Sequence, residues 1–222
     1  MVENLVIKDE GTRVKLTVKH NGEDLTFIDP PCGPGSYVDT QRRLEEAGLV
    51  APTMAEVVSL VYAALQDRSQ GVAMNRFRGR IAGKFTLPSL RGFTGNLCLP
   101  NDGEEVRDGV IIQDRPKIKN GMFFMDRADL VKRLEADDPS VRFVPFGFET
   151  GEMGPDQFRK NPYVQGLVGE EGAEKYAEIA GKFSINPYIN KDFSMSKPLT
   201  LLESNISSGT RLVLFPFPHK RR

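Results

Sequence analysis

The chain has 222 residues and carries 30 basic and 30 acidic side chains, so its formal net charge at neutral pH is zero. Charged residues make up 27% and hydrophobic residues 39%, a composition typical of a folded globular protein and unlike that of a disordered one. No apolar run approaches the roughly 18 residues of a membrane span, and two distant cysteines, Cys32 and Cys98, argue against a disulfide framework or a structural zinc site. The first ten residues lack the pattern of a secretory signal, so we expect a cytoplasmic protein without a membrane partner.

Alternating hydrophobic residues predict antiparallel strands within residues 4–28. Residues 14–18 alternate between apolar and polar side chains, which gives a strand one buried and one solvent-facing side. The dipeptide Asn21-Gly22 follows, and it favours a two-residue hairpin turn because both turn positions need a positive φ angle. We therefore expect a hairpin that turns at this dipeptide.

Two helices are predicted after a loop rich in proline and glycine at residues 29–35. The first is expected from Asp39, as the N-terminal cap, through Ala47, with Gly48 as its stop. The second begins at a capping box, in which Thr53 and Glu56 satisfy each other's backbone amides. Its core-facing side has helical spacing and consists of Val57, Leu60, Val61, Ala64 and Leu65.

Residues 68–100 form what we call the basic interval. No acidic residue lies between Asp67 and Asp102. The same stretch contains six basic residues: Arg68, Arg76, Arg78, Arg80, Lys84 and Arg91. The remainder of the chain has 24 basic and 30 acidic residues, and thus a net charge of minus six. A local excess of positive charge in a neutral protein indicates an anionic partner.

The alternation of arginine with Phe77 and Gly79 predicts an extended strand over residues 76–80, with three guanidinium groups on one face. Such a face can hold phosphates by paired hydrogen bonds while a phenylalanine stacks a base. The predicted polyanion-binding residues are Arg76, Arg78, Arg80, Lys84 and Arg91, and the partner would be a nucleic acid or an acidic protein. The alternative is that these side chains pair with acidic residues elsewhere in the chain or form a protein interface.

Residues 85–182 are predicted to contain short strands and then mainly helices. Strands are expected at 85–87, 93–99, 110–112, 122–125 and 141–148. A helix capped by Asp126 separates the last two, which permits either a parallel crossover or an antiparallel return. Pro145 assigns the final strand to a sheet edge or a bulge. Two more helices are expected, one near Pro155 and one from 161 to 180.

The last of these helices is expected to have a polar and an apolar side. Glu171 and Lys175 would pair on the outside, and Gly181 would end the helix. Its predicted inner side consists of Ala173, Tyr176, Ala177 and Ala180. Glu171, Glu174 and Glu178 form a carboxylate stripe, for which a solvated helical face is the simplest interpretation and a magnesium or acid–base site the alternative.

Residues 185–209 are polar, and we expect long loops there around a short strand at 199–202, followed by a final strand at 211–215. Helices and strands are interleaved without a linker of distinct composition. We therefore predict a single α+β domain over residues 1–217, in which a largely antiparallel, mixed sheet is covered by three to four helices. Residues 218–222 would form a mobile basic tail.

Two classes of function are compatible with this sequence. The first is a non-enzymatic binding protein that engages nucleic acid or another polyanion through the basic interval. The second is a small-molecule enzyme with a phosphate- or metal-assisted site between loops 29–36 and 149–155.

The weak catalytic candidates for that enzyme are Glu149, Glu152 and Cys32. The two glutamates lie in a glycine-rich loop after a strand, where carboxylates can serve as acid and base. Cys32 precedes a helix, whose free amides favour a thiolate, although an ordinary turn with a bystander cysteine is the alternative. The two histidines, His20 and His219, provide no histidine ligand pair or triad, and no metal site or particular cofactor is indicated.

Overall fold

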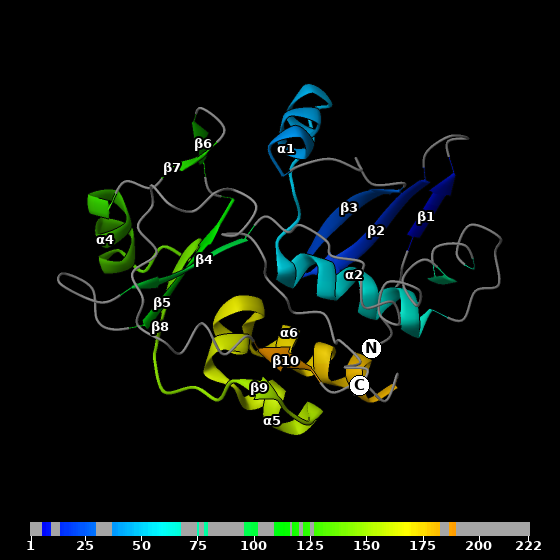
Figure 1. Cartoon of the computed structure of the whole chain (residues 1–222). Helices are drawn as coiled ribbons and strands as arrows, with labels where there is room; N and C mark the ends of the chain where they lie inside the picture. Colours follow the sequence, from blue (N-terminus) through cyan, green and yellow to red (C-terminus); the bar gives the residue numbers. More distant parts are fainter. Residues whose placement is uncertain are drawn as a thin grey trace, which may run out of the picture.

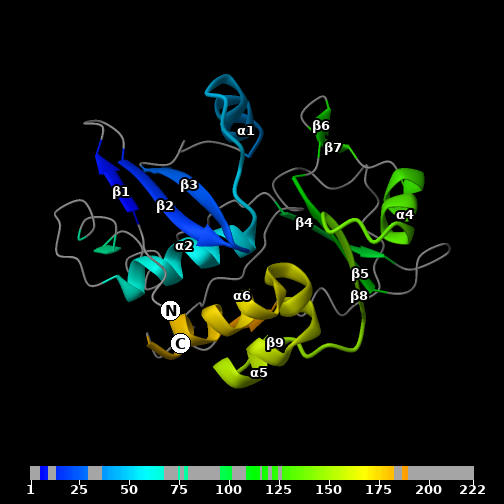
Figure 2. The ribbon, with the colours of Figure 1, turned by 180° about the vertical axis from the view of Figure 1, so that it is seen from behind.

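The computed structural model describes residues 6–9, 14–29, 37–67, 75, 78–79, 96–101, 109–115, 117–119, 122–124, 127–182 and 187–189. The chain is an α+β protein, as predicted, and all described strand pairs are antiparallel. The strands are divided between two three-stranded sheets, with orders β1-β2-β3 and β4-β5-β8, and two two-stranded ribbons, β6-β7 and β9-β10. The two larger sheets lie on opposite sides of helices α2 and α6 (Figures 1 and 2).

The first sheet contains β1 (Val6–Asp9), β2 (Val14–His20) and β3 (Glu23–Asp29). The predicted hairpin is confirmed, because β2 and β3 pair antiparallel and the turn residues Asn21 and Gly22 have φ angles of 50° and 84°. Leu16 and Val18 are each 1% exposed, so the alternating pattern does point one side of β2 into the core. The ring of His20 then joins the sheet to α2 through a hydrogen bond of 3.0 Å to the buried Ser59 hydroxyl.

Helix α1 (Tyr37–Glu46) begins two residues before the predicted cap, so Asp39 lies inside the helix. It ends at Glu46, one residue before the predicted Ala47. The predicted stop at Gly48 is confirmed, since its φ angle is 65° and its N–H donates to the Glu45 carbonyl at 3.0 Å. The Leu49 N–H donates to the Leu44 carbonyl at 2.7 Å, which completes a Schellman motif.

Helix α2 (Met54–Gln66) begins at the predicted capping box. The Thr53 N–H donates to Glu56 Oε2 at 2.7 Å, and the Glu56 N–H donates to Thr53 Oγ1 at 3.3 Å. Of the predicted core-facing residues, Leu60, Val61 and Ala64 are buried, whereas Val57 and Leu65 are partly buried. The buried surface differs from the predicted one because the helix packs against both β2 and α6. The additional buried residues are Met54, Glu56, Val58, Ser59 and Ala63.

The second sheet contains β4 (Asn96–Asn101), β5 (Gly109–Asp114) and β8 (Val141–Pro145). Helix α4 (Arg127–Glu135) packs against β8, and the ribbon of β6 (Lys117–Lys119) and β7 (Met122–Phe124) is separate from this sheet. Because β7 and β8 belong to different sheets, the strand–helix–strand succession is neither a crossover nor a return. Pro145 does lie on an edge strand, as predicted.

Helices α5 (Pro155–Lys160) and α6 (Pro162–Lys182) follow, with β9 (Gly151–Glu152) before them and β10 (Tyr188–Ile189) after them. Helix α6 is interrupted at Gly169, whose φ and ψ angles are 74° and 167°. Strand β10 pairs with β9, although the sequence predicted a loop there. No helix in the described ranges is both long enough and apolar enough to cross a membrane. The predicted strands at 85–87, 199–202 and 211–215 and the tail at 218–222 lie outside the described residues.

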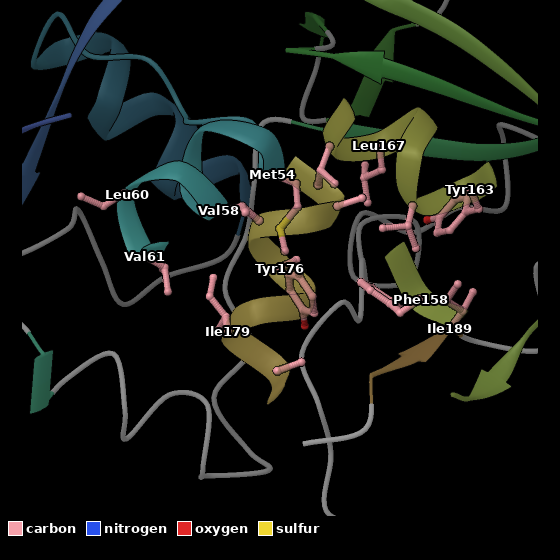
Figure 3. Close-up of a cluster of buried hydrophobic side chains, with 14 of the residues drawn as sticks. Met54, Val58, Leu60, Val61, Phe158, Tyr163, Leu167, Tyr176, Ile179 and Ile189 are labelled. Carbon is pink, nitrogen blue, oxygen red and sulfur yellow. The ribbon is translucent and has the colours of Figure 1, made fainter. Parts of the chain in front are cut away.

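One hydrophobic core connects the two sheets through α2 and α6 (Figure 3). Leu16 from the first sheet and Ile112 from the second belong to the same buried cluster. Aromatic pairs lie where α5 and the loop before it meet α6, with ring centroids 4.8 Å apart for Phe158 and Tyr176. The predicted inner side of α6 is confirmed, since all four of its residues are buried: Ala173, Tyr176, Ala177 and Ala180.

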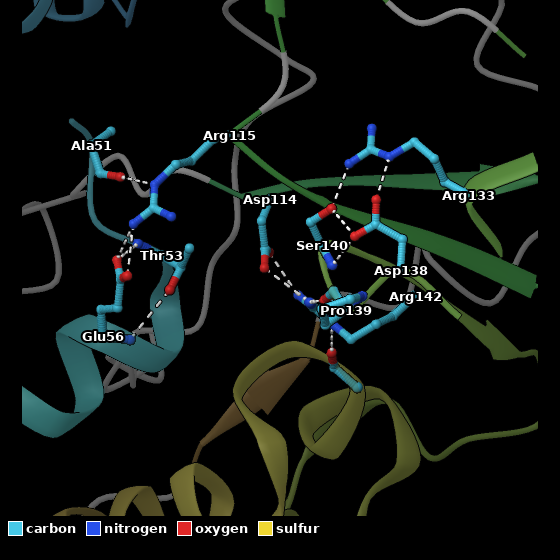
Figure 4. Close-up of polar contacts among 11 residues, drawn as sticks. Ala51, Thr53, Glu56, Asp114, Arg115, Arg133, Asp138, Pro139, Ser140 and Arg142 are labelled. Atoms are coloured by element: carbon cyan, nitrogen blue, oxygen red, sulfur yellow. Dashed lines mark hydrogen bonds and ion pairs between the residues drawn. The ribbon is translucent and has the colours of Figure 1, made fainter. Parts of the chain in front are cut away.

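Arg142, on β8, links the second sheet to α6 (Figure 4). Its guanidinium makes two hydrogen bonds to the Asp114 carboxylate, of 2.6 and 2.9 Å, and Nε donates to the Gly166 carbonyl at 2.6 Å. Nη1 also donates to the Pro139 carbonyl. Carbonyls in the turn before a helix break lack intrahelical donors, so Arg142 acts as a cap for the first part of α6.

Two further polar contacts secure the second sheet (Figure 4). Arg115 Nη2 lies 2.6 and 2.8 Å from the Glu56 carboxylate oxygens, which joins the end of β5 to the start of α2. In the loop before β8, the Ser140 hydroxyl and the Arg133 guanidinium donate to Asp138, which holds the pKa of that carboxyl well below its ordinary value.

Gln113, on β5, supplies a first stability prediction. Within the described ranges, its side-chain oxygen is a buried acceptor without a hydrogen-bond partner, and the residue is 7% exposed. It lies opposite Val141, on the side of the sheet that packs against Leu130 of α4. We expect Gln113→Met to raise the free energy of unfolding by about 1 kcal/mol, because a buried unpaired acceptor is removed at similar volume.

Chemical denaturation measures this change. The control is Gln165→Met, because the Gln165 side chain donates to the Arg159 carbonyl at 3.0 Å. Losing that bond should lower the free energy of unfolding by about 1 kcal/mol. A decrease for Gln113→Met similar to that of the control would contradict the prediction.

Candidate nucleic-acid interface

The structure describes one of the five predicted polyanion-binding residues. Arg78 is helical, as are Asn75 and Gly79, so the predicted extended strand over 76–80 is wrong at residues 78 and 79. The physical reason is that residues 74–80 contain no β-branched side chain, and so short an alternation does not distinguish a strand from a helix. Arg76, Arg80, Lys84 and Arg91 lie outside the described residues.

The Arg78 guanidinium binds the C-terminal end of α2. Nε donates to the Ala64 carbonyl at 2.8 Å, and Nη2 donates to the Asp67 carbonyl. The same nitrogen lies 4.0 Å from the Asp67 carboxylate, and the side chain is 23% exposed. The structure therefore agrees with the alternative prediction for Arg78, in which the side chain binds groups within the protein.

A second cation, Lys182, binds the same end of α2. Its Nζ donates to the Leu65 carbonyl at 2.9 Å. Helix α2 has no basic residue in its own last turn, so both positive charges come from other parts of the chain. Cations stabilise a helix C-terminus because the last carbonyls carry partial negative charge and have no intrahelical donor. Arg78 and Lys182 thus both cap the C-terminal end of α2, and we call this pair of cations the α2 clasp.

All three glutamates of the α6 stripe have partners, and two of these partners lie on neighbouring helices. Glu171 pairs with Lys175 at 3.0 Å, as predicted, and the Tyr62 hydroxyl donates to Glu178 at 2.8 Å. Glu174 accepts from Arg159 of α5 at 2.8 Å. Lys175 differs from the prediction of an outer pair, because its side chain is only 10% exposed and its ammonium lies 5.7 Å from the Tyr62 ring centroid. The glutamates therefore have a structural explanation, because Glu174 and Glu178 join α6 to α5 and α2.

The predicted catalytic glutamates are both exposed. The Glu149 carbonyl accepts from the Asn161 side chain at 2.9 Å, and Glu152 belongs to β9, where it pairs with Tyr188. Loop 149–155 is therefore held by α5–α6 and by β10. Cys32 and the rest of loop 29–36 lie outside the described residues, so a site shared by the two loops stays a prediction. In the described part of the chain, no three His, Cys, Asp or Glu residues are grouped to hold a metal ion.

Sequence reasoning missed the partners of Arg78. Asp67 and Ala64 are 11 and 14 residues away in sequence, and Lys182 is 117 residues from the Leu65 carbonyl that it binds. One signal was present: a helix without basic residues in its last turn leaves its C-terminal carbonyls to be satisfied from elsewhere. No family model matches the chain, and no curated protein or solved structure is significantly similar to it.

Proposed function

We propose that the protein binds single-stranded nucleic acid through the basic interval, as a binding protein rather than an enzyme. One observation carries the proposal: six basic residues and no acidic one lie between Asp67 and Asp102 in a chain that is otherwise acidic by six charges. Contiguous positive charge is the requirement for binding a phosphate backbone. An acidic protein partner is the outcome to be distinguished by experiment.

Two features support nucleic acid as the partner. The interval also contains Phe77, Phe85 and Phe93, and proteins that bind single strands combine cations with aromatic side chains on which bases stack. In addition, Arg78 attaches the interval to the C-terminal end of a buried helix. The described residues beside Arg78, Asn75 and Gly79, are helical, and residues already held in one conformation lose less conformational entropy on binding than free ones.

Fluorescence anisotropy with a labelled oligothymidylate tests the proposal. Binding should weaken with potassium chloride, because each phosphate contact contributes about −0.7 to the slope of log K against log salt. A variant with Arg76, Arg80, Lys84 and Arg91 all replaced by glutamine should lose most of this slope, which is about 3 for four contacts.

The control variant removes the same charge from exposed residues elsewhere, and it should bind like the wild type. Its replaced residues are Lys19, Arg42, Lys132 and Lys160. Equal loss in both variants would show that net charge alone drives binding. Failure of the wild-type protein to bind the oligonucleotide at low salt would remove the proposal and leave an acidic protein as the partner to test.

A further inference from the structure

We propose that β3 binds an extended, basic segment of a partner protein as an additional strand of the first sheet. Among the described residues, β3 pairs with β2 on one edge and with no strand on the other (Figure 1). An unpaired strand edge presents backbone N–H and C=O groups to which a second chain can bind. This role of β3 is independent of the proposed nucleic-acid binding.

The edge of β3 lacks the features that hinder pairing at the other described edges of the two larger sheets. Strand β1 has only four residues and includes Lys8, and strands β4 and β8 contain Pro100 and Pro145. Short strands, lysines and prolines are common means of blocking a sheet edge. Strand β3 has seven residues in continuous register with β2, and it contains neither proline nor lysine. Of these edges, that of β3 is therefore the best suited to accept another strand.

The hairpin turn determines which residues of β3 face this edge. His20 and Glu23 flank the two-residue turn and lie opposite each other. Residues in that position exchange both backbone hydrogen bonds, and such pairs alternate with pairs that exchange none. The backbone N–H and C=O groups of Asp24, Thr26 and Ile28 therefore point away from β2, towards an added strand.

The apolar side chains of β3 indicate part of what this strand would contain. Leu25 and Phe27 pack against the core but are only partly buried, whereas Leu16 on the central strand is 1% exposed. Side chains at alternate positions of a strand lie on the same face of a sheet. An added strand with apolar residues at alternate positions would cover Leu25 and Phe27 and extend the core.

The charge of β3 favours a basic partner over a second copy of this chain. Strand β3 contains three acidic residues and no basic one, so two β3 strands side by side would double the number of acidic residues at the edge. Like charges on neighbouring strands are destabilising. Glu23 and Asp24 are both exposed, and the pair of Asp24 with Lys19 lies at the surface, where such pairs contribute little. Lysine or arginine in the added strand would complement these carboxylates.

A labelled peptide tests the addition of a strand. The probe is an acetylated and amidated heptapeptide in which lysine and valine alternate, and fluorescence anisotropy measures its binding. Two further versions carry N-methyl groups either on the lysine amides or on the valine amides. Because an added strand uses only one of its edges, one methylated version should lose binding while the other keeps it. Replacing the lysines of the peptide by glutamate should weaken binding by about tenfold or more.

Thr26→Pro tests the same contact from the side of the protein. The Thr26 N–H points away from β2, so proline removes a donor to the added strand and keeps the backbone pairing of β2 with β3. We expect peptide binding to weaken by about tenfold or more. The control is Thr17→Val, which should bind like the wild type. Both substitutions remove the hydrogen bond of 2.8 Å between the two threonine hydroxyls, but only residue 26 lies on the edge strand.

Three results would overturn the proposal: equal effects of the two methylations, failure of the wild type to bind the unmodified peptide, or a wild-type dimer that Thr26→Pro dissociates. The last result, measured by sedimentation, would make a second copy of the chain the occupant of the edge. The methylated peptides need no protein variant, so they test the proposal even if Thr26→Pro unfolds. Oligonucleotide binding is measured separately, because no residue of β3 belongs to the basic interval.

Discussion

Replacing Arg142 by methionine should lower the free energy of unfolding by about 2–4 kcal/mol, because it removes the cation and two hydrogen bonds from a largely buried carboxylate. The Arg142 and Asp114 side chains are 28% and 19% exposed and share two hydrogen bonds. The substitution also removes the donor to the Gly166 carbonyl, just before the interruption of α6. Denaturant titration followed by circular dichroism measures the change.

The matched control is Lys19→Met in the first sheet. Lys19 and Asp24 form an ion pair of 2.9 Å, but their side chains are 54% and 64% exposed. Exposed pairs contribute less than about 1 kcal/mol, so this variant should unfold nearly like the wild type. Similar losses for Arg142→Met and Lys19→Met would mean that Arg142 is merely a surface cation and that α6 needs no cap from β8.

Replacing Gly169 by alanine should lower the free energy of unfolding by about 1–3 kcal/mol through backbone strain alone. Its φ and ψ angles of 74° and 167° fall in a region that is open essentially only to glycine. A Cβ atom built at this position has no atom within 4 Å, so a steric clash does not contribute. The expected loss is therefore the free energy needed to hold an alanine in this conformation or to rearrange the junction in α6.

Gly181→Ala in the same helix provides the opposite expectation. Gly181 is exposed, and a Cβ atom there also has open space. Alanine is favoured over glycine in a helix by up to about 1 kcal/mol, so this variant should be equally or more stable than the wild type. Stabilisation by both substitutions would show that α6 can continue through residue 169 without interruption.

The interruption at Gly169 explains how α6 can contact both the second sheet and α2, which packs on the first sheet. Before it, the Gly166 carbonyl is bound by Arg142 of the second sheet. After it, Glu178 and Lys182 contact α2, which packs on the first sheet. The change of direction lets both parts of α6 bury residues in the common core, since Leu167 and Ile179 are each 2% exposed. The substitutions at Arg142 and Gly169 therefore both test the junction between the two parts of α6.

Local sequence signals determined several elements. The turn at Asn21-Gly22, the capping box of Thr53 and Glu56, and the stop at Gly48 are all present where the sequence predicted them. Each depends on residues no more than five positions apart, so the physical information is contained in a short stretch of chain. The inner side of α6, formed by Ala173, Tyr176, Ala177 and Ala180, was predictable because helical periodicity fixes which residues share a face, whereas the burial of Lys175 was not predicted.

Strand partnership required the tertiary structure. The sequence indicated several of the strands, but it did not show that they divide into two larger sheets, nor that β10 exists and pairs with β9. Pairing of distant strands depends on packing against the rest of the protein, and two-residue strands such as β9 and β10 carry too little periodicity to be recognised. The prediction of a single domain over 1–217 stays a prediction, since parts of that range lie outside the described residues.

The basic interval shows the same distinction. The amino-acid sequence by itself determined its charge, because the absence of acidic residues between Asp67 and Asp102 is a property of composition. Only the tertiary structure decided where the Arg78 charge is directed. Ala64 and Asp67 present helix-end carbonyls to Arg78 because α2 ends there, and α6 brings Lys182 to the same end. A guanidinium binds whichever acceptors the fold places within reach, and spacing in the sequence does not contain that information.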